Sequence, residues 1–252
     1  MRGFKNKRFS ILPAIRRVLS VPLYHRRHSI PDYRAIQTLS FEEIQVSNEK
    51  SHHLSAFFFH GLLGSARNWR SFSRSLLSAL SVSGIEEDWR MVLVDLRNHG
   101  MSAELKALTL PHDIPNSARD VADLVKTLGW TWPEVVIGHS MGGKVALDFL
   151  EAAARGDYGV SVSLPKQLWV LDSVPGKAAA NRGDGEVENV IKTLQSLPSS
   201  VPSRRWVVNH MMEKGFSKAL ADWVGSNLKK AGDHEEWCFN LEGAIDMFES
   251  YR

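Results

Sequence analysis

The feature that most constrains this chain is the pentapeptide GHSMG at residues 138–142. An apolar run over residues 134–137 precedes it, and residues 141–154 come after it with the apolar spacing of a helix. This context predicts a strand that turns sharply into a helix, because the two glycines allow close backbone contacts that a side chain would block. The turn would place the Ser140 hydroxyl beside a helix N-terminus, which favours developing negative charge. We therefore expect a nucleophilic serine, not an incidental serine in a glycine-rich turn.

Apolar runs and helical spacing alternate through the first two thirds of the chain. A polar–apolar alternation predicts an edge hairpin within residues 33–46. Short apolar runs predict strands over 54–59, 89–94, 134–137 and 168–171, and helical spacing predicts helices over 68–80, 116–128 and 141–154. This order of elements predicts an α/β fold, with a mostly parallel sheet covered by helices on both faces.

The sequence changes character after residue 176. Residues 177–185 are small, polar and glycine-containing. The rest of the chain has helical patterns without a convincing strand, over 186–197, 203–214, 217–230 and 239–251. We interpret residues 32–176 as a sheet-containing core and residues 177–252 as a helical cap over that sheet.

A second glycine-containing loop, HGLLG at residues 60–64, comes directly after the expected strand over 54–59. By itself it is an ordinary strand-to-helix turn. Beside a nucleophilic serine, such a loop supplies a backbone N–H group to the oxyanion of an acyl-transfer intermediate. We expect the N–H of Leu62 in this role, together with the N–H of Met141, which is the residue after the nucleophile.

Four segments together resemble one family. The motifs HGLLGSARNWR, VDLRNHGMS, GHSMGGKVAL and LDSVPG are similar to those of the α/β-hydrolase domain-containing protein 11 family, which comprises mitochondrial or bacterial esterase-like enzymes. The resemblance covers about residues 54–176 and extends more loosely to residue 252. It implies an α/β-hydrolase fold with a helical cap, and a serine hydrolase that acts on ester, thioester or lipid-like acyl substrates. No metal or organic cofactor is implied.

The acid of a catalytic triad comes after the nucleophile along the chain in this fold. Asp172 ends the next expected strand, at the position that matches the Asp-x-x-Pro motif of the family, and is our first choice. Glu242 in the cap is a weaker candidate. Asp95 precedes the nucleophile, so we expect it to accept backbone hydrogen bonds in its turn.

No histidine matches the catalytic base of the family, which lies after a further strand near the chain end. His210 and His234 are expected at the surface, whereas His60, His99 and His139 lie in motifs as structural neighbours. Two more strands and a closing helix are expected after the cap, so we interpret the sequence as C-terminally truncated. Loss of one triad member leaves only about 10³–10⁴-fold catalysis over water, and the chain as given is expected to be a poor or inactive hydrolase.

These residues are compatible with two functions from different classes. One is a serine hydrolase that forms an acyl-enzyme on Ser140 with a small-molecule acyl ester. The alternative is a non-catalytic binding protein that keeps the pocket without the base. A haloalkane dehalogenase or epoxide hydrolase is disfavoured, because those enzymes resemble this chain in fold but have an aspartate at the position of Ser140.

The basic charge of the chain is concentrated at its start. Residues 1–31 contain eight basic and no acidic residues, although the whole chain has a net charge of only +3. An arginine-rich, acid-free start predicts an organellar transit peptide, mitochondrial before chloroplast, with a disordered basic tail as the alternative. Because the folded part is net acidic, we expect no nucleic-acid partner. No apolar run is long enough to predict a membrane span, and the single cysteine, Cys238, excludes a disulfide within the chain.

Overall fold

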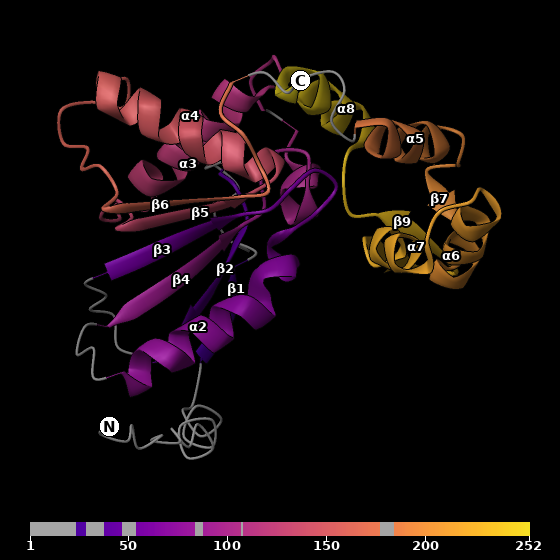
Figure 1. Cartoon of the computed structure of the whole chain (residues 1–252), viewed down its shortest axis with the longest axis horizontal. Helices are drawn as coiled ribbons and strands as arrows, with labels where there is room; N and C mark the ends of the chain where they lie inside the picture. Colours follow the sequence, from indigo (N-terminus) through magenta and orange to yellow (C-terminus); the bar gives the residue numbers. More distant parts are fainter. Residues whose placement is uncertain (1–23, 29–37, 47–53, 84–87, 107, 177–183) are drawn as a thin grey trace, which may run out of the picture.

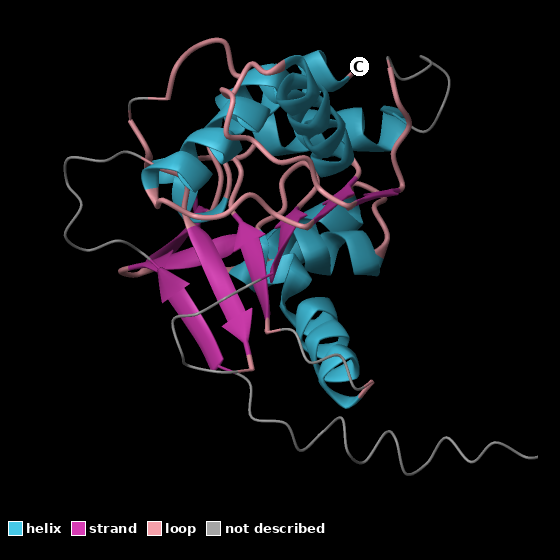
Figure 2. Ribbon diagram, turned by 90° about the vertical axis from the view of Figure 1, so that its left-hand side faces the viewer, coloured by secondary structure: helices cyan, strands magenta, loops and turns pink. Residues whose placement is uncertain are grey.

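The computed structural model describes residues 24–28, 38–46, 54–83, 88–106, 108–176 and 184–252. In this part of the chain a twisted six-stranded sheet has the order β1-β2-β4-β3-β5-β6 (Figures 1 and 2). The pairs β3–β4, β3–β5 and β5–β6 are parallel, and β1–β2 and β2–β4 are antiparallel. The bounds are β1 Tyr24–His28, β2 Phe41–Gln45, β3 Leu54–Phe59, β4 Trp89–Val94, β5 Val135–His139 and β6 Gln167–Leu171.

The central strands are apolar on both faces because both faces are covered, as Figure 1 shows. In β3, Phe57 and Phe59 pack with helices α3 (Ile114–Thr127) and α4 (Met141–Arg155) on one side. Phe58 points the other way, towards η1 (Ala66–Trp69) and α2 (Arg70–Val82). Alternate residues of a strand point to opposite faces, so a continuous apolar run fills two cores. The predicted α/β sheet with helices on both faces is confirmed.

The beginning of the sheet differs from the prediction. β2 lies in the range predicted for the edge hairpin, but its antiparallel partner is β1, which falls within residues 1–31, predicted as the leader. The sheet therefore begins before residue 32. The sequence of β1, YHRRH, has no apolar alternation and therefore contains no strand signal. Residues 1–23 and 33–37 lie outside the described residues, and the transit peptide stays a prediction.

The cap contains helices and also a small sheet, so the prediction of a purely helical cap was wrong. Its elements are α5 Asp184–Gln195, β7 Ser200–Val201, α6 Arg204–Glu213, α7 Lys218–Gly225, β8 Leu228–Ala231 and β9 His234–Trp237. β8 replaces the end of the helix predicted over 217–230, and β9 lies between this range and the helix predicted over 239–251. Gly232 and Asp233 form a two-residue loop between the two strands, which is a hairpin signal. The register also pairs Lys229 with Glu236, and opposite charges across a hairpin stabilise it.

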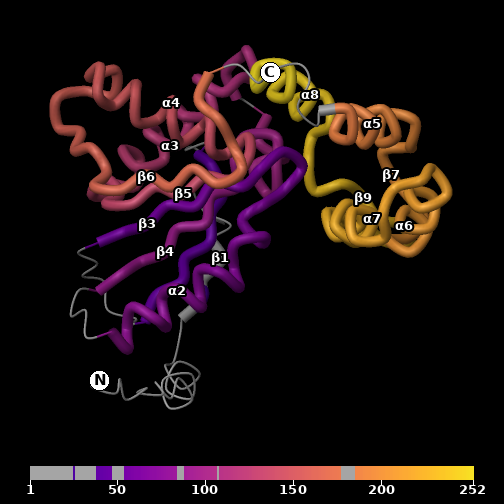
Figure 3. Tube along the Cα trace, viewed as in Figure 1, coloured from indigo at the N-terminus to yellow at the C-terminus, as the bar shows by residue number. Residues whose placement is uncertain are grey.

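The last helix, α8 (Leu241–Tyr251), was predicted in the cap but packs against the core (Figure 3). Met247 is fully buried in the cluster formed by β3, α3 and α4. The Ile114 N–H at the start of α3 donates to Ser250 Oγ over 3.1 Å. The cap is therefore an excursion that leaves the core after β6 and returns to it through α8. None of the described helices has the length and apolarity that a bilayer crossing requires.

Candidate active site

The strand-to-helix turn predicted at Ser140 is present between β5 and α4. Ser140 has φ 52° and ψ −120°, a conformation that L-residues rarely adopt and that persists where the surrounding structure enforces it. A Cβ on Gly138 would lie 2.2 Å from the Gly142 carbonyl oxygen, so only glycine allows the helix to approach the strand this closely. The Ser140 N–H donates to the Leu171 carbonyl over 2.8 Å, which ties the turn to β6.

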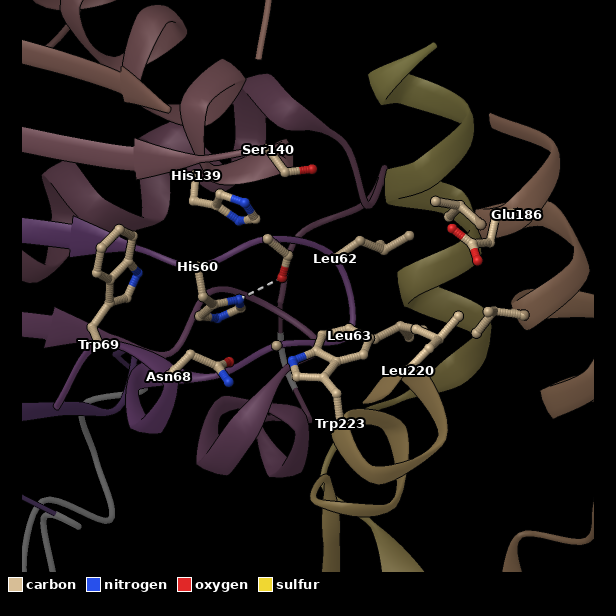
Figure 4. Close-up of a pocket in the computed structure, with 14 residues that line it drawn as sticks. His60, Leu62, Leu63, Asn68, Trp69, His139, Ser140, Glu186, Leu220 and Trp223 are labelled. Atoms are coloured by element: carbon tan, nitrogen blue, oxygen red, sulfur yellow. Dashed lines mark hydrogen bonds between the residues drawn. The ribbon is translucent and has the colours of Figure 1, made fainter. Parts of the chain in front are cut away.

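Ser140 opens into a cavity of about 370 Å³ between the core and the cap (Figure 4). The core supplies the loop at residues 60–64, the end of η1, and the turn after β5. The cap supplies side chains from α5 and α7. The fourteen lining residues are His60, Gly61, Leu62, Leu63, Gly64, Asn68, Trp69, His139, Ser140, Glu186, Val187, Val190, Leu220 and Trp223. Most of these side chains are apolar, which suits an acyl chain.

The two predicted oxyanion donors lie beside the serine. A Cβ on Gly61 would be 3.3 Å from Ser140 Cβ, so the loop that carries Leu62 touches the turn. The Leu63 N–H donates to His99 Nε2 over 3.0 Å, whereas the Leu62 N–H has no acceptor within the described residues. Met141 is the first residue of α4, where a helix leaves its N–H groups without intrahelical acceptors. Both N–H groups are thus available to an oxyanion.

Two buried histidines hold this loop in place. His60 Nε2 accepts the Leu96 N–H over 3.0 Å, and His99 Nε2 accepts the Leu63 N–H over the same distance. Their Nδ1 atoms lie 2.8 Å from carbonyl oxygens, which fixes the tautomer with the proton on Nδ1. Burial lowers the pKa of His60 to about 3 and that of His99 to about 4. Because both ring nitrogens of each are engaged, neither is a base for Ser140.

Asp95 has the structural role predicted for it. Its carboxylate accepts the Ala66 N–H over 2.7 Å and the Met101 N–H over 3.0 Å. Burial raises its pKa to about 6, against the effect of these two hydrogen bonds. Asp95 thus joins η1 to the segment that carries His99, and both flank the loop at residues 60–64.

Asp172 lies near the site but does not line the cavity. It has φ 49° directly after β6, and its side chain is 90% exposed. Its Oδ2 atom is 3.9 Å from Nε2 of His139, the residue before the nucleophile. Within the described part of the chain, no histidine hydrogen-bonds the Ser140 hydroxyl. The structure therefore brings Ser140, Leu62 and Met141 together and places Asp172 beside His139.

The remaining candidates lie away from the cavity. Glu242 is in the first turn of α8, and His210 stacks on Trp206 in α6. His234 is at the β8–β9 hairpin, 3.5 Å from Glu236. Among the described residues, no three His, Cys, Asp or Glu side chains gather into a possible metal site.

Two residues that the sequence did not single out for a role contribute to the site. Lys144 Nζ donates to the Gly176 carbonyl over 2.7 Å and to the Tyr251 carbonyl over 2.5 Å, and so fixes both ends of the cap excursion. The motif GHSMGGK contributes to the family resemblance, but it does not predict that Lys144 binds the carbonyl groups of Gly176 and Tyr251. Glu186 places a carboxylate in the cavity wall opposite Ser140.

Comparison with known proteins agrees with this geometry. The family model for the alpha/beta hydrolase fold matches residues 57–157. The chain has the α/β-hydrolase fold. It is similar to a solved marine microorganism esterase, with a TM-score of 0.64 and 24% identity over 83% of this chain and 72% of that one.

The named relatives confirm the resemblance drawn from the four motifs. The sn-1-specific diacylglycerol lipase ABHD11 of Danio rerio is 29% identical over 198 residues, covering 76% of this chain and 55% of that protein. The protein of the same name from Xenopus laevis is 38% identical over 193 residues, covering 73% of this chain and 53% of that protein. The chain spans about half the length of these curated relatives.

Proposed function

We propose that this chain is the nucleophile-bearing part of a serine hydrolase that cleaves ester, thioester or lipid-like acyl substrates. One observation carries the proposal: the strained Ser140 opens into an apolar cavity, beside the available N–H groups of Leu62 and Met141. A strained nucleophile and two preorganised donors are what acyl transfer requires.

In the proposed reaction Ser140 Oγ attacks the acyl carbonyl carbon and gives its proton to a general base, a role that no described histidine fills; the base later returns this proton to the leaving group. The carbonyl oxygen becomes an oxyanion, which the N–H groups of Leu62 and Met141 stabilise. The carbon–oxygen or carbon–sulfur bond to the leaving group then breaks, and the leaving group takes a proton. Water hydrolyses the resulting acyl-enzyme and regenerates Ser140.

The relatives support an ester substrate with an apolar acyl group. The ABHD11 proteins are described as diacylglycerol lipases, and protein phosphatase methylesterase 1 of Rattus norvegicus is 28% identical over 74% of this chain and 47% of that protein. The apolar walls contributed by Val190, Leu220 and Trp223 are consistent with such a ligand. We propose Asp172 as the acid that orients the base.

A non-catalytic binding function is the second candidate, and one observation favours it. The two fully buried histidines near the cavity are engaged with backbone groups, and no described histidine hydrogen-bonds the Ser140 hydroxyl. Without a positioned base, Ser140 keeps the low reactivity of an ordinary hydroxyl.

A fluorophosphonate probe distinguishes the two functions. An activated Ser140 reacts with the probe, and Ser140→Ala then abolishes both labelling and any p-nitrophenyl ester turnover. Ser102→Ala is a matched control, because Ser102 is a buried serine outside the cavity. Labelling that persists in Ser140→Ala would refute the assignment of the nucleophile. A folded chain that binds acyl ligands without labelling would support the binding protein.

A further inference from the structure

The wall of the cavity opposite Ser140 contains one acidic side chain, which is exposed and has apolar cap residues beside it in the lining. Glu186 lies near the start of α5, and Figure 4 shows it across the cavity from Ser140 and Leu62. The neighbouring cap residues Val190, Leu220 and Trp223 are apolar. A ligand that extends from Ser140 towards α5 therefore meets a single carboxylate.

No described lysine, arginine or hydrogen-bond donor pairs with this carboxylate. The described residues around the cavity include no lysine or arginine, and Glu186 has no ion pair or hydrogen bond within the described part of the chain. His60, which also lines the cavity, is held neutral by burial and by its two backbone hydrogen bonds. Among the described lining residues, Glu186 is therefore the acidic side chain that meets the part of the ligand that reaches α5.

We propose that Glu186 is a specificity-determining residue that rejects acyl ligands carrying a negative charge near α5 and admits neutral or cationic ones. The inference rests on the proposed function, because it assumes that the cavity holds an acyl group attached at Ser140. Two like charges a few ångströms apart at a partly exposed site repel each other, and this repulsion lowers the affinity for a negatively charged ligand by about tenfold. Neutral acyl chains gain from the apolar walls without this repulsion.

The test measures binding, so it does not require turnover. The probes are octan-2-one and 7-oxooctanoate, two unreactive methyl ketones of equal length that differ in a terminal carboxylate. Calorimetric titration of the full chain gives the ratio of their dissociation constants. We expect Glu186→Gln to improve 7-oxooctanoate binding relative to octan-2-one by about tenfold. Glu213→Gln is the matched control, because it removes one negative charge from an exposed position outside the cavity.

A second measurement uses the unsubstituted chain. Raising the NaCl concentration from about 20 mM to about 500 mM screens exposed charges, so the preference for octan-2-one should shrink. An unchanged ratio in Glu186→Gln, or no effect of salt, overturns the role of Glu186 and leaves the nucleophile Ser140 untouched. Failure of both ketones to bind also overturns it, and fluorophosphonate labelling then decides separately whether Ser140 is activated.

Discussion

Replacement of Arg97 with methionine tests how the turn beneath the active-site loop is held. The Arg97 side chain is fully buried, and its guanidinium donates to both carboxylate oxygens of Asp120 over 2.7 and 2.8 Å. It also donates to three backbone carbonyl oxygens, at Thr109, Pro111 and Asn116. Arg97 thus links the turn that carries His99 to helix α3.

Arg97→Met would remove the cation that pairs with Asp120. It would also remove the donor to the three carbonyl groups. Burial already raises the pKa of Asp120 even with Arg97 present. Removal of one partner of a buried ion pair costs about 3–5 kcal/mol. For a domain of this size each kcal/mol lowers Tm by about 2–4 °C, so we expect a fall of roughly 6–20 °C.

The assay is urea and thermal unfolding monitored by circular dichroism, with two further variants. Asp120→Asn should cost less than Arg97→Met, because the guanidinium keeps its three carbonyl acceptors. The double variant Arg97→Met/Asp120→Leu should recover part of the loss, since it leaves no unpaired carboxylate. A Tm for Arg97→Met within about 2 °C of the wild type, or strictly additive losses in the double variant, would refute the reasoning.

Two further predictions concern the supports of the site. The depressed pKa values of His60 and His99, about 3 and about 4, mean that both histidines stabilise the fold fully above pH 6.5 and lose this contribution as the pH falls. Asp95, with its pKa raised to about 6, acts in the opposite direction. At about 1.4 kcal/mol per pKa unit, the unfolding free energy should fall by roughly 3 kcal/mol between pH 7 and pH 4.5. Urea titrations that give the same unfolding free energy at pH 7 and at pH 4.5 would contradict this. Lys144→Met should cost about 2–4 kcal/mol, because it removes two charged hydrogen bonds to carbonyl groups, and should speed hydrogen exchange in α8. Lys166→Met, at an exposed position, is its control, and equal exchange in the two variants would count against a role of Lys144 in fixing the cap.

The turn at Ser140 was predictable because its signal is local. The glycines at 138 and 142, the preceding apolar run and the subsequent helical spacing all fall within about 20 residues. The loop at residues 60–64 and the hydrogen-bonding role of Asp95 were inferred from equally short motifs. In each case the backbone geometry depends on residues adjacent in sequence, so a pattern of a few letters contains the information.

The features that the sequence did not reveal depend on distant contacts or on weak local patterns. Lys144 contacts the carbonyl of Tyr251, 107 positions away, and nothing near either residue predicts that pairing. The strands β8 and β9 have four residues each and are rich in charge, so they have no apolar alternation to detect. Glu186 faces the cavity only because the cap lies against the end of β5. Helical spacing in the sequence does not predict where the cap lies relative to the sheet.

His99 engages one of the N–H groups of the loop at residues 60–64. His99 accepts the N–H of Leu63, a residue with φ 58°, so this donor is turned into the core. The preceding N–H, that of Leu62, has no acceptor among the described residues, and Leu62 and Ser140 line the same cavity. A protonated His99 could not accept the Leu63 N–H, which is why a ring held neutral by burial suits this position. In the proposed chemistry His60 and His99 therefore hold the loop that carries Leu62 in place and do not transfer protons.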